Sequence, residues 1–366
     1  MKKVAIIIDS LAGGGAEKVM LEIASGFLSQ NAKVNFYIRK NHIEHLIPDN
    51  LNLFCLEDIK TQQKMRRKDY ALLLKKVLIK DGPFDLILSN LESTDKMVRL
   101  LKFPNTYFVI HNTISQKLKK RYSNASLIHK IKYLREILKF KRLYHHQNLI
   151  TVSHGVQKDL LTTLHIKPKF ITTIYNPFDI NGIIEKASEF NPLVPKEPYI
   201  VHIGRFLIEH KRQDLLLEAY QHANIKEKLV IIGKGQDKSK ILNIIQKLHL
   251  ENKVIMLDFQ KNPYPFIKNA EAFVLSSDYE GLPTVLIEAL ILQTPIVSTD
   301  CPSGPREILE GSLNKYLSSC NDPIMLGEKI KMALSEKSNI KKTLASINLE
   351  KYQIDAITKQ YLELGN

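Results

Sequence analysis

The chain has 366 residues, more than one ordinary hydrophobic core supports, so its length predicts two domains. Hydrophobic residues make up 44% and charged residues 25% of it, the balance of a soluble globular protein, and no apolar run approaches the roughly 18 residues of a membrane-spanning helix. The formal net charge of +15 is uneven, because residues 1–180 hold 30 Lys and Arg against 15 Asp and Glu, whereas residues 181–366 hold 23 of each. We therefore expect an anionic partner to bind the first half.

The chain begins with a basic and then apolar segment that looks like a signal peptide. Its apolar run is short and shows no cleavage site of the A-x-A type, so residues 3–9 are predicted to be a first buried strand. The three cysteines, Cys55, Cys301 and Cys320, are far apart and odd in number, which fits neither a disulfide framework nor a zinc site. We therefore expect a reducing compartment, the cytosol.

Short apolar strands alternate with amphipathic helices along both halves of the chain. In the first half, strands are predicted at 3–9, 33–39, 84–90, 106–112, 148–154 and 170–176. After a proline-rich break at 191–198, strands are predicted at 199–206, 228–235, 253–259, 271–277 and 294–299. This alternation predicts two doubly wound α/β domains with parallel sheets, a cleft between the domains, and ligands at the carboxyl ends of the strands.

Two stretches of the first half concentrate its positive charge. Residues 60–80 hold eight basic residues against one Asp, and residues 116–146 hold ten against one Glu. In the second stretch, apolar residues recur among the bases at helical spacing, at Leu127, Ile131, Leu134 and Leu138. Such a helix suits an anionic membrane surface, although a solvated helix that packs its apolar stripe on its own domain has the same pattern. Nucleic acid is not expected as a partner, because no recognition motif and no interleaved stacking aromatics are present.

A glycine-rich loop, DSLAGGGAEKV, joins the first strand to its helix. Glycines at this position let the backbone approach a ligand, and the start of the helix offers free N–H groups to an anion. The loop does not match a dinucleotide fingerprint, because Lys18 stands at the third glycine position, and no Gly-Lys-Ser/Thr makes it a phosphate loop. A tight turn without a ligand remains the alternative.

Two cations follow the first strand of the second half, in HIGRFLIEHK. Arg205 and Lys211 lie between a strand and a helix, where both can point into the cleft. A pair of cations at this place would neutralise a diphosphate leaving group as its bond breaks. An ordinary surface Arg and Lys are the alternative.

Two carboxylates flank a Gly-Leu-Pro turn in DYEGLPTVLIEAL. Glu280 precedes the turn, after a predicted strand, and can accept hydrogen bonds from sugar hydroxyls. Pro283 suits the first turn of a helix, so the backbone N–H groups near residues 281–284 can meet phosphate. Glu288 lies further along this helix among apolar residues, where a ribose diol or an internal partner would satisfy its carboxylate.

The motifs GGGAEKV, GRFLIEHK, DYEGLPTVLIEAL and CPSGPREIL, in this order and spacing, resemble glycosyltransferase family 4 over essentially the whole chain. The resemblance implies the GT-B architecture, with two Rossmann-like domains that face each other across a cleft. Residues 1–180 would bind the acceptor, and a last helix at 351–366 would pack back on them. Residues 181–350 would bind the nucleotide sugar.

The resemblance also implies roles for single residues. Glu280 would contact the donor sugar and Glu288 the nucleotide ribose, while Arg205 and Lys211 would bind the diphosphate. His111, at the end of a predicted strand, would lie beside the donor sugar and the acceptor.

Backbone groups complete the expected site. The amides of the turn would meet the phosphates, with the glycines of the N-terminal loop and of the GRF motif close to the donor; these residues are Gly281, Leu282, Pro283, Thr284, Gly14, Gly15 and Gly204. Lys211 stands six positions after Arg205, one more than is common in the family, so Arg212 is an alternative cation.

The expected reaction is a retaining transfer of a hexose or N-acetylhexosamine from a nucleoside diphosphate, with UDP favoured, to a lipid-linked or lipopolysaccharide acceptor. No metal or other cofactor is expected, because no Asp-x-Asp element follows a predicted strand. The family resemblance further implies bacterial surface-polysaccharide assembly at the inner face of the cytoplasmic membrane. The alternatives are a UDP-sugar 2-epimerase of the same architecture and a nucleotide-sugar-binding protein without turnover.

Overall fold

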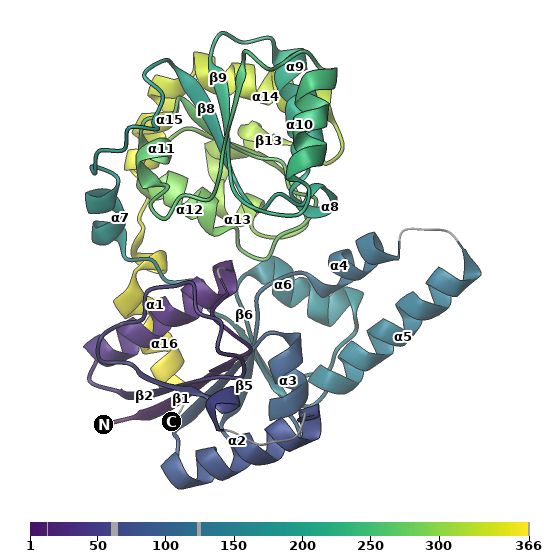
Figure 1. The fold of residues 1–366 in the computed structure, drawn as a ribbon, viewed down its shortest axis with the longest axis vertical. Helices are drawn as coiled ribbons and strands as arrows, with labels where there is room; N and C mark the ends of the chain where they lie inside the picture. The colour runs from purple at the N-terminus through teal and green to yellow at the C-terminus, as the bar shows by residue number, and fades with distance from the viewer. Residues whose placement is uncertain (13, 60–64, 123–125, 365–366) are drawn as a thin grey trace. The chain divides into compact units, whose positions relative to one another are not determined.

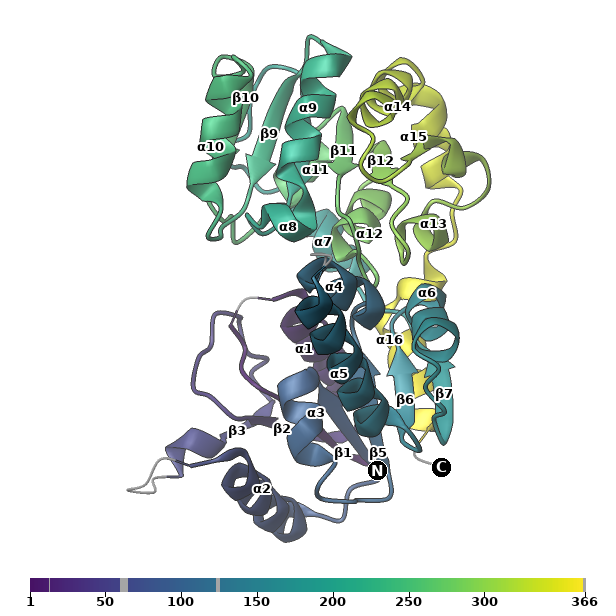
Figure 2. The same cartoon turned by 90° about the vertical axis from the view of Figure 1, so that its right-hand side faces the viewer.

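The computed structural model describes residues 1–12, 14–59, 65–122 and 126–364. The chain divides into two compact units (Figure 1). Unit 1 consists of Met1–Asp179 with Glu350–Asn366, and unit 2 consists of Ile180–Leu349. Each unit holds one parallel β-sheet with helices on both of its faces, the doubly wound α/β arrangement that the sequence predicts (Figure 2).

The sheet of unit 1 has the strand order β3-β2-β1-β4-β5-β6-β7. Its strands are β1 (Lys3–Ile8), β2 (Lys33–Ile38), β3 (Asn52–Cys55), β4 (Leu86–Asn90), β5 (Thr106–Ile110), β6 (Asn148–Thr151) and β7 (Phe170–Thr173). In register, Val4 of β1 pairs with Val34 on one side and with Leu86 on the other. The six predicted strands of this half are confirmed, whereas β3 was missed because only alternate residues of this edge strand are shielded.

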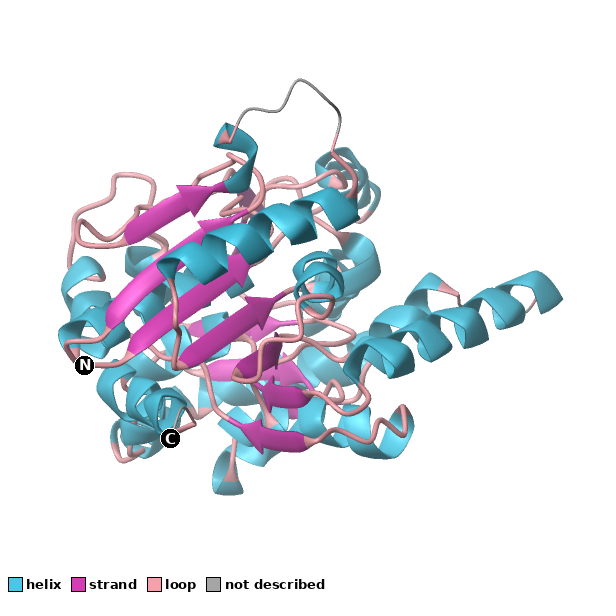
Figure 3. Cartoon of the chain, turned by 90° about the horizontal axis from the view of Figure 1, so that it is seen from below, coloured by secondary structure: helices cyan, strands magenta, loops and turns pink. Residues whose placement is uncertain are grey.

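Helices cover both faces of this sheet. They are α1 (Gly15–Ser29), α2 (Arg67–Asp81), α3 (Glu92–Val98), α4 (Ile114–Arg121), α5 (Leu127–Tyr144), α6 (His154–Lys158) and α16 (Ile354–Glu363), with short turns at Leu56–Asp58, Asp159–Thr163 and Glu350–Tyr352. Seen from below in Figure 3, the strands lie between these helices, and α5 extends away from the rest of the unit.

The last helix of the chain, α16, packs on the first helix, α1. Gly26 allows this close approach, because a Cβ atom there would lie 2.4 Å from Cγ2 of Ile354. The Gln30 amide donates a hydrogen bond of 2.6 Å to Oγ1 of Thr358. Tyr361 is buried in the same contact. The end of the chain therefore belongs to the core of unit 1.

The sheet of unit 2 has the strand order β10-β9-β8-β11-β12-β13. Its strands are β8 (Tyr199–Ile203), β9 (Lys228–Ile232), β10 (Val254–Leu257), β11 (Ala272–Leu275), β12 (Ile296–Thr299) and β13 (Leu317–Ser318). The five predicted strands are confirmed. The edge strand β13 was missed, because two residues are too short for a periodic pattern.

The helices of unit 2 follow its strands in the expected alternation. They are α7 (Ile180–Lys186), α8 (Ile208–Lys211), α9 (Gln213–Ala223), α10 (Lys238–Lys247), α11 (Tyr264–Lys268), α12 (Thr284–Ile291), α13 (Pro305–Ile308), α14 (Pro323–Ser335) and α15 (Lys337–Ala345), with a short turn at Gly311–Tyr316. Across the described parts of both units, no helix is long and apolar enough to cross a membrane.

In each sheet the strand order reverses beside one central strand. In unit 1 this strand is β1, which lies between β2 and β4, and in unit 2 it is β8, which lies between β9 and β11. Ligands of such folds bind outside the carboxyl ends of the strands at this reversal. The loops after β1, β4, β8 and β11 are therefore the places where a site is expected.

Candidate functional site

The loops after β8 and β11 bring a buried ion pair to the reversal point of unit 2. Lys211, at the end of α8, donates a hydrogen bond of 2.6 Å from Nζ to Oε1 of Glu280. The side chains of Lys211 and Glu280 are only 13% and 9% exposed. The two residues stand 69 positions apart in the chain, so the sheet topology creates this pair.

Two histidines that the sequence analysis did not single out lie beside this ion pair. His210 stacks on the ring of Tyr279 at 4.2 Å, its Nε2 lies 2.7 Å from the carbonyl oxygen of Tyr279, and the same nitrogen is 3.9 Å from Glu280. His202, on β8, is fully buried, and its Nδ1 lies 3.0 Å from the carbonyl oxygen of Val274. The only signal for His210 in the sequence is its position before Lys211.

Burial and charge together set the ionisation of this cluster. Burial lowers the pKa of both His202 and His210 to about 4, so both rings are neutral at pH 7. Burial by itself would raise the pKa of Glu280, but the charge of Lys211 and its hydrogen bond outweigh burial and lower that pKa. Lys211 therefore keeps Glu280 ionised despite the burial of its side chain.

The structure separates the two candidate cations that follow Arg205. Arg212 donates to Asp214 and, at 2.8 Å, to Asp278, and it also contacts Asn321. Lys211 alone of this pair of neighbours reaches Glu280, so the extra loop residue does not move Arg212 into its place. Arg205 is exposed, and its carbonyl oxygen accepts a 2.8 Å hydrogen bond from the Gln213 side chain, which fixes its backbone.

The CPSGP segment, residues 301–305, packs against the Gly-Leu-Pro turn, residues 281–283. Ser303 donates a 2.7 Å hydrogen bond from Oγ to the carbonyl oxygen of Gly281. Gly304 adopts φ +92°, and a Cβ atom there would lie 2.3 Å from Cδ of Pro283. The sequence analysis expected Pro283 in the first turn of the helix. In the structure α12 begins at Thr284, so Pro283 is extended and directly precedes the first turn.

Two further predicted residues of unit 2 lie close to this turn or to the ion pair. Glu288 is the fifth residue of α12 and is 4% exposed among apolar neighbours. Gly204 directly follows β8, and a Cβ atom on it would lie 3.3 Å from Nε2 of His202 and 3.6 Å from the Lys211 side chain. An alanine at position 204 would therefore be tight against His202 and in ordinary contact with Lys211.

The predicted residues of unit 1 lie at the carboxyl ends of β1 and β5. Gly14 and Gly15 open α1, and a Cβ atom on Gly14 would lie 2.1 Å from the Glu17 carboxylate. Of the glycine-rich loop, residue 13 lies outside the described residues. His111, just after β5, is half-buried.

A buried asparagine orients His111. Oδ1 of Asn90, at the end of β4, lies 2.9 Å from Nε2 of His111, while Nδ2 of Asn90 faces the carbonyl oxygens of Ile7 and Leu88. Since a carbonyl oxygen only accepts, Nε2 carries the proton and Nδ1 keeps a lone pair. Burial lowers the pKa of His111 to about 4, so the ring is neutral at pH 7. Sequence reasoning missed Asn90.

Family models match almost the whole chain in two segments. The model for glycosyl transferases group 1 matches residues 183–350, and the model for glycosyltransferase family 4 matches residues 13–181. These segments contain the site loops of unit 2 and of unit 1, respectively.

Characterised relatives match over most of their length. The N-acetylgalactosamine-N,N'-diacetylbacillosaminyl-diphospho-undecaprenol 4-alpha-N-acetylgalactosaminyltransferase of Campylobacter jejuni is 31% identical over 316 residues, which cover 84% of this chain and 83% of the relative. The lipopolysaccharide 1,6-galactosyltransferase of Salmonella typhimurium is 26% identical over 332 residues, which cover 86% of this chain and 85% of the relative.

Solved structures share the fold over the full length. Anabaena HepE in complex with UDP-glucose has a TM-score of 0.77 at 19% identity, with 99% of each chain covered. Staphylococcus aureus TarM, in a complex that contains UDP, has a TM-score of 0.73 at 15% identity, with 100% of each chain covered. With the two family models and the Campylobacter relative, this fold shows that the chain belongs to glycosyltransferase family 4 and has the GT-B architecture.

Proposed function

We propose that this glycosyltransferase moves a hexose or N-acetylhexosamine from a nucleoside diphosphate sugar, with UDP as the favoured carrier, to a lipid-linked or lipopolysaccharide glycan, and retains the anomeric configuration. The observation that carries this proposal is the buried Lys211–Glu280 pair beside the Gly281–Thr284 turn, at the strand-order reversal of unit 2. The complexes of HepE with UDP-glucose and of TarM with UDP support the choice of donor.

The donor diphosphate requires cations and N–H donors in a fixed arrangement. Lys211 and Arg205 supply positive charge, and the backbone amides of the turn and the start of α12 supply donors near a helix N-terminus. The hydrogen bond from Ser303 to Gly281 and the close approach of Gly304 to Pro283 hold the turn in place. In unit 1, Gly14 and Gly15 lie at the start of α1, where backbone amides are likewise offered to an anion.

Glu288 and Glu280 hold the two sugars of the donor. A carboxylate such as Glu288, which lies on α12 among apolar residues, accepts both hydroxyls of the ribose. Glu280, ionised by Lys211, accepts hydrogen bonds from hydroxyls of the sugar that is transferred. His111 meets the sugar or the acceptor as a neutral ring with a free Nδ1 lone pair.

In this reaction the acceptor attacks from the face that the diphosphate leaves. The bond from the anomeric carbon to the diphosphate oxygen breaks as the bond to the acceptor oxygen forms, and the departing phosphate takes the acceptor proton. Lys211, Arg205 and the amides of the turn stabilise the charge on the diphosphate. Glu280 positions the sugar and forms no covalent bond, so a trapped glycosyl–Glu280 adduct would refute this version of the mechanism.

The acceptor is proposed from the relatives and from charge. The Campylobacter relative is named for an undecaprenol-diphosphate acceptor and the Salmonella relative for lipopolysaccharide. The excess of basic residues lies in the first half, with 30 Lys and Arg against 15 Asp and Glu in residues 1–180. We place the reaction at the anionic inner face of the cytoplasmic membrane, where such acceptors are anchored.

Nucleotide binding provides the first test. Thermal shift of the purified protein is measured with UDP, GDP and ADP, for the wild type, for Glu288→Ala and for the exposed control Glu251→Ala. We expect the largest shift with UDP, its loss in Glu288→Ala and its retention in the control. If no nucleotide shifts the melting temperature, the assignment of Glu288 to the ribose is wrong.

Turnover tests the reaction class and the expected independence of metal. Purified protein is incubated with the UDP-sugar that gives the largest shift, with and without a lipid-linked acceptor, and the products are resolved by mass spectrometry and NMR. We expect a product with retained configuration that depends on the acceptor and persists in EDTA. Conversion of the UDP-sugar without an acceptor would instead show an epimerase.

A further inference from the structure

The helix α5 of unit 1 carries its apolar side chains on its outer face. Exposed fractions range from 49% to 73% for the five apolar residues that we call the ridge: Leu127, Ile128, Ile131, Leu134 and Leu138. Four of them follow the spacing i, i+4, i+7 and i+11, so they form one continuous strip along the helix. No residue in the range 127–139 is buried. The ridge therefore does not serve the core of unit 1.

The opposite face of α5 is the one that meets the protein. His129, Tyr133 and Glu136 are half-buried there, and the ring of His129 lies 6.3 Å from that of Tyr122, near the end of α4. Glu136, the one acidic residue of α5, is thus on the inner side. A helix that packs an apolar stripe on its own domain has the reverse arrangement, so this alternative from the sequence is wrong for α5.

The last turn of α5 fixes the helix to the sheet. Phe140, Leu143 and Tyr144 are buried, and the Tyr144 hydroxyl donates a 2.7 Å hydrogen bond to Oδ2 of the fully buried Asp95. Oδ1 of Asp95 accepts from Ser89 of β4 at 2.6 Å. The helix is therefore held at its C-terminal end, and its N-terminal end extends away from the rest of unit 1, as Figures 1 and 3 show.

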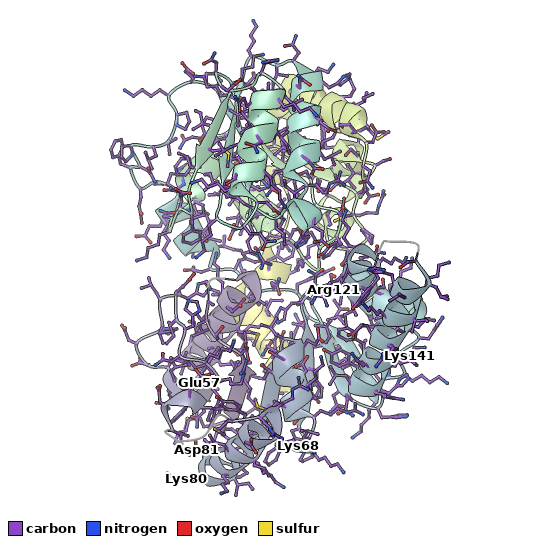
Figure 4. All side chains as sticks on the ribbon, turned by 45° about the vertical axis from the view of Figure 1, so that its right-hand side comes forward. Glu57, Lys68, Lys80, Asp81, Arg121 and Lys141 are labelled. Carbon is purple, nitrogen blue, oxygen red and sulfur yellow. The ribbon has the colours of Figure 1, made fainter. Side chains whose placement is uncertain are left out.

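Basic side chains flank the ridge along the whole helix. They are Lys130, Lys132, Arg135, Lys139, Lys141 and Arg142. At about 3.6 residues per turn, Lys130 and Lys141 lie on one side of the ridge and Lys132 and Lys139 on the other, where Lys139 also pairs with Glu136. Figure 4 shows Lys141 on α5, with Arg121 at the end of α4 and Lys68 on α2 in the same unit.

We propose that the ridge of α5 inserts into the headgroup and upper acyl region of an anionic lipid bilayer, with the helix axis parallel to the membrane and the flanking bases on lipid phosphates. An apolar strip bordered by Lys and Arg has the chemistry that binds such an interface. A second copy of this chain does not fit, because two ridges in contact would bring two sets of six basic residues together.

This inference deepens the proposed function and rests on it for its purpose, since a membrane-anchored acceptor needs an enzyme at the membrane. Because the ridge belongs to unit 1 and Glu288 belongs to unit 2, the two can be tested separately. A variant of the ridge should keep the thermal shift with UDP, whereas Glu288→Ala should keep membrane binding.

The absence of tryptophan from the sequence allows a clean probe of insertion. Leu134→Trp places the only Trp of the chain on the ridge, and Leu242→Trp, at a 46% exposed position of unit 2, is the control. Vesicles of phosphatidylcholine with and without one-quarter phosphatidylglycerol are titrated into each protein. We expect a blue shift of Trp emission for Leu134→Trp with the anionic vesicles only, and none for Leu242→Trp. Unshifted Leu134→Trp emission in protein that sediments with the vesicles would overturn the insertion of the ridge.

Sedimentation with the same vesicles separates the apolar and the charged contributions. The ridge variant is Ile131→Ser/Leu134→Ser/Leu138→Ser, and the charge variant is Lys132→Glu/Arg135→Glu/Lys139→Glu. The control, Lys247→Glu/Lys253→Glu/Lys261→Glu, makes the same change in net charge at exposed positions of unit 2. We expect at least tenfold weaker binding for the first two and wild-type binding for the control. Equal loss in the charge variant and the control would show a response to net charge alone. Wild-type binding by the ridge variant would equally refute the proposal.

Discussion

Replacing Lys211 with methionine removes the cation from a carboxylate that stays buried. The Glu280 side chain is 9% exposed, so it cannot regain its hydration without a rearrangement of the β11 loop. Removal of one partner from a buried ion pair costs about 3–5 kcal/mol of unfolding free energy. We therefore expect a loss of about 3 kcal/mol at pH 7.

The pH dependence of this loss has a definite sign. In the wild type the pKa of Glu280 is lowered on folding, so its contribution to stability is present above the unfolded pKa and is lost as pH falls. In Lys211→Met, burial is no longer opposed by the lysine and raises that pKa instead. The folded mutant then takes up a proton, so the difference in stability from wild type should shrink as pH falls from 7 toward 4.

Urea unfolding followed by far-UV circular dichroism at pH 7 and pH 5 measures this difference. Hydrogen exchange of β8 and β11 amides assigns the loss to unit 2. The double variant Lys211→Met/Glu280→Gln removes both charges and is expected to recover most of the stability, since a neutral amide tolerates burial better. Equal stability of Lys211→Met and wild type at pH 7, or a loss that does not change with pH, would refute the reasoning.

Two further predictions concern single residues of the site. His111 should titrate near pH 4 in a ¹³C- or ¹H-detected NMR experiment. Asn90→Ala should bring the midpoint of His111 closer to the ordinary value of about 6.5, because water can then reach the ring. An ordinary midpoint for His111 in the wild type would contradict the burial of this ring. Gly304→Ala should destabilise unit 2 by about 1–2 kcal/mol from the positive φ of this residue alone. It should also weaken UDP binding, because the new Cβ atom displaces Pro283 and the phosphate-facing turn. The control is Gly311→Ala, also at positive φ but in open space, which should lose stability without losing UDP binding.

Several features of the fold follow from local sequence alone. Strands such as β1 and β9, buried on both faces, appear as continuous apolar runs that predict a parallel sheet with helices on both sides. The edge strand β3 lacks this signal, because it is shielded at alternate residues only, and β13 is too short to show any period. Burial on both sides makes a strand visible in the sequence, and edge positions remove that burial.

The spacing of the site motifs predicted which loops carry chemistry, but it did not decide which side chains meet. Lys211 and Arg212 are adjacent in the sequence and equally cationic, and only the fold assigns Lys211 to Glu280 and Arg212 to Asp214 and Asp278. The pairing of Asn90 with His111 likewise joins two strand ends 21 residues apart. Such contacts depend on strand order, which residue spacing does not encode.

The helix α5 shows most clearly what the sequence determines and what the tertiary structure decides. Its sequence determined that Leu127, Ile131, Leu134 and Leu138 share one face with bases beside them, because a helical period fixes which residues are neighbours on the surface of a helix. The period is the same whether this face turns toward the protein or away from it. Only the tertiary structure decided that it turns away, because burial of Phe140, Leu143 and Tyr144 at one end sets the rotation of the whole helix.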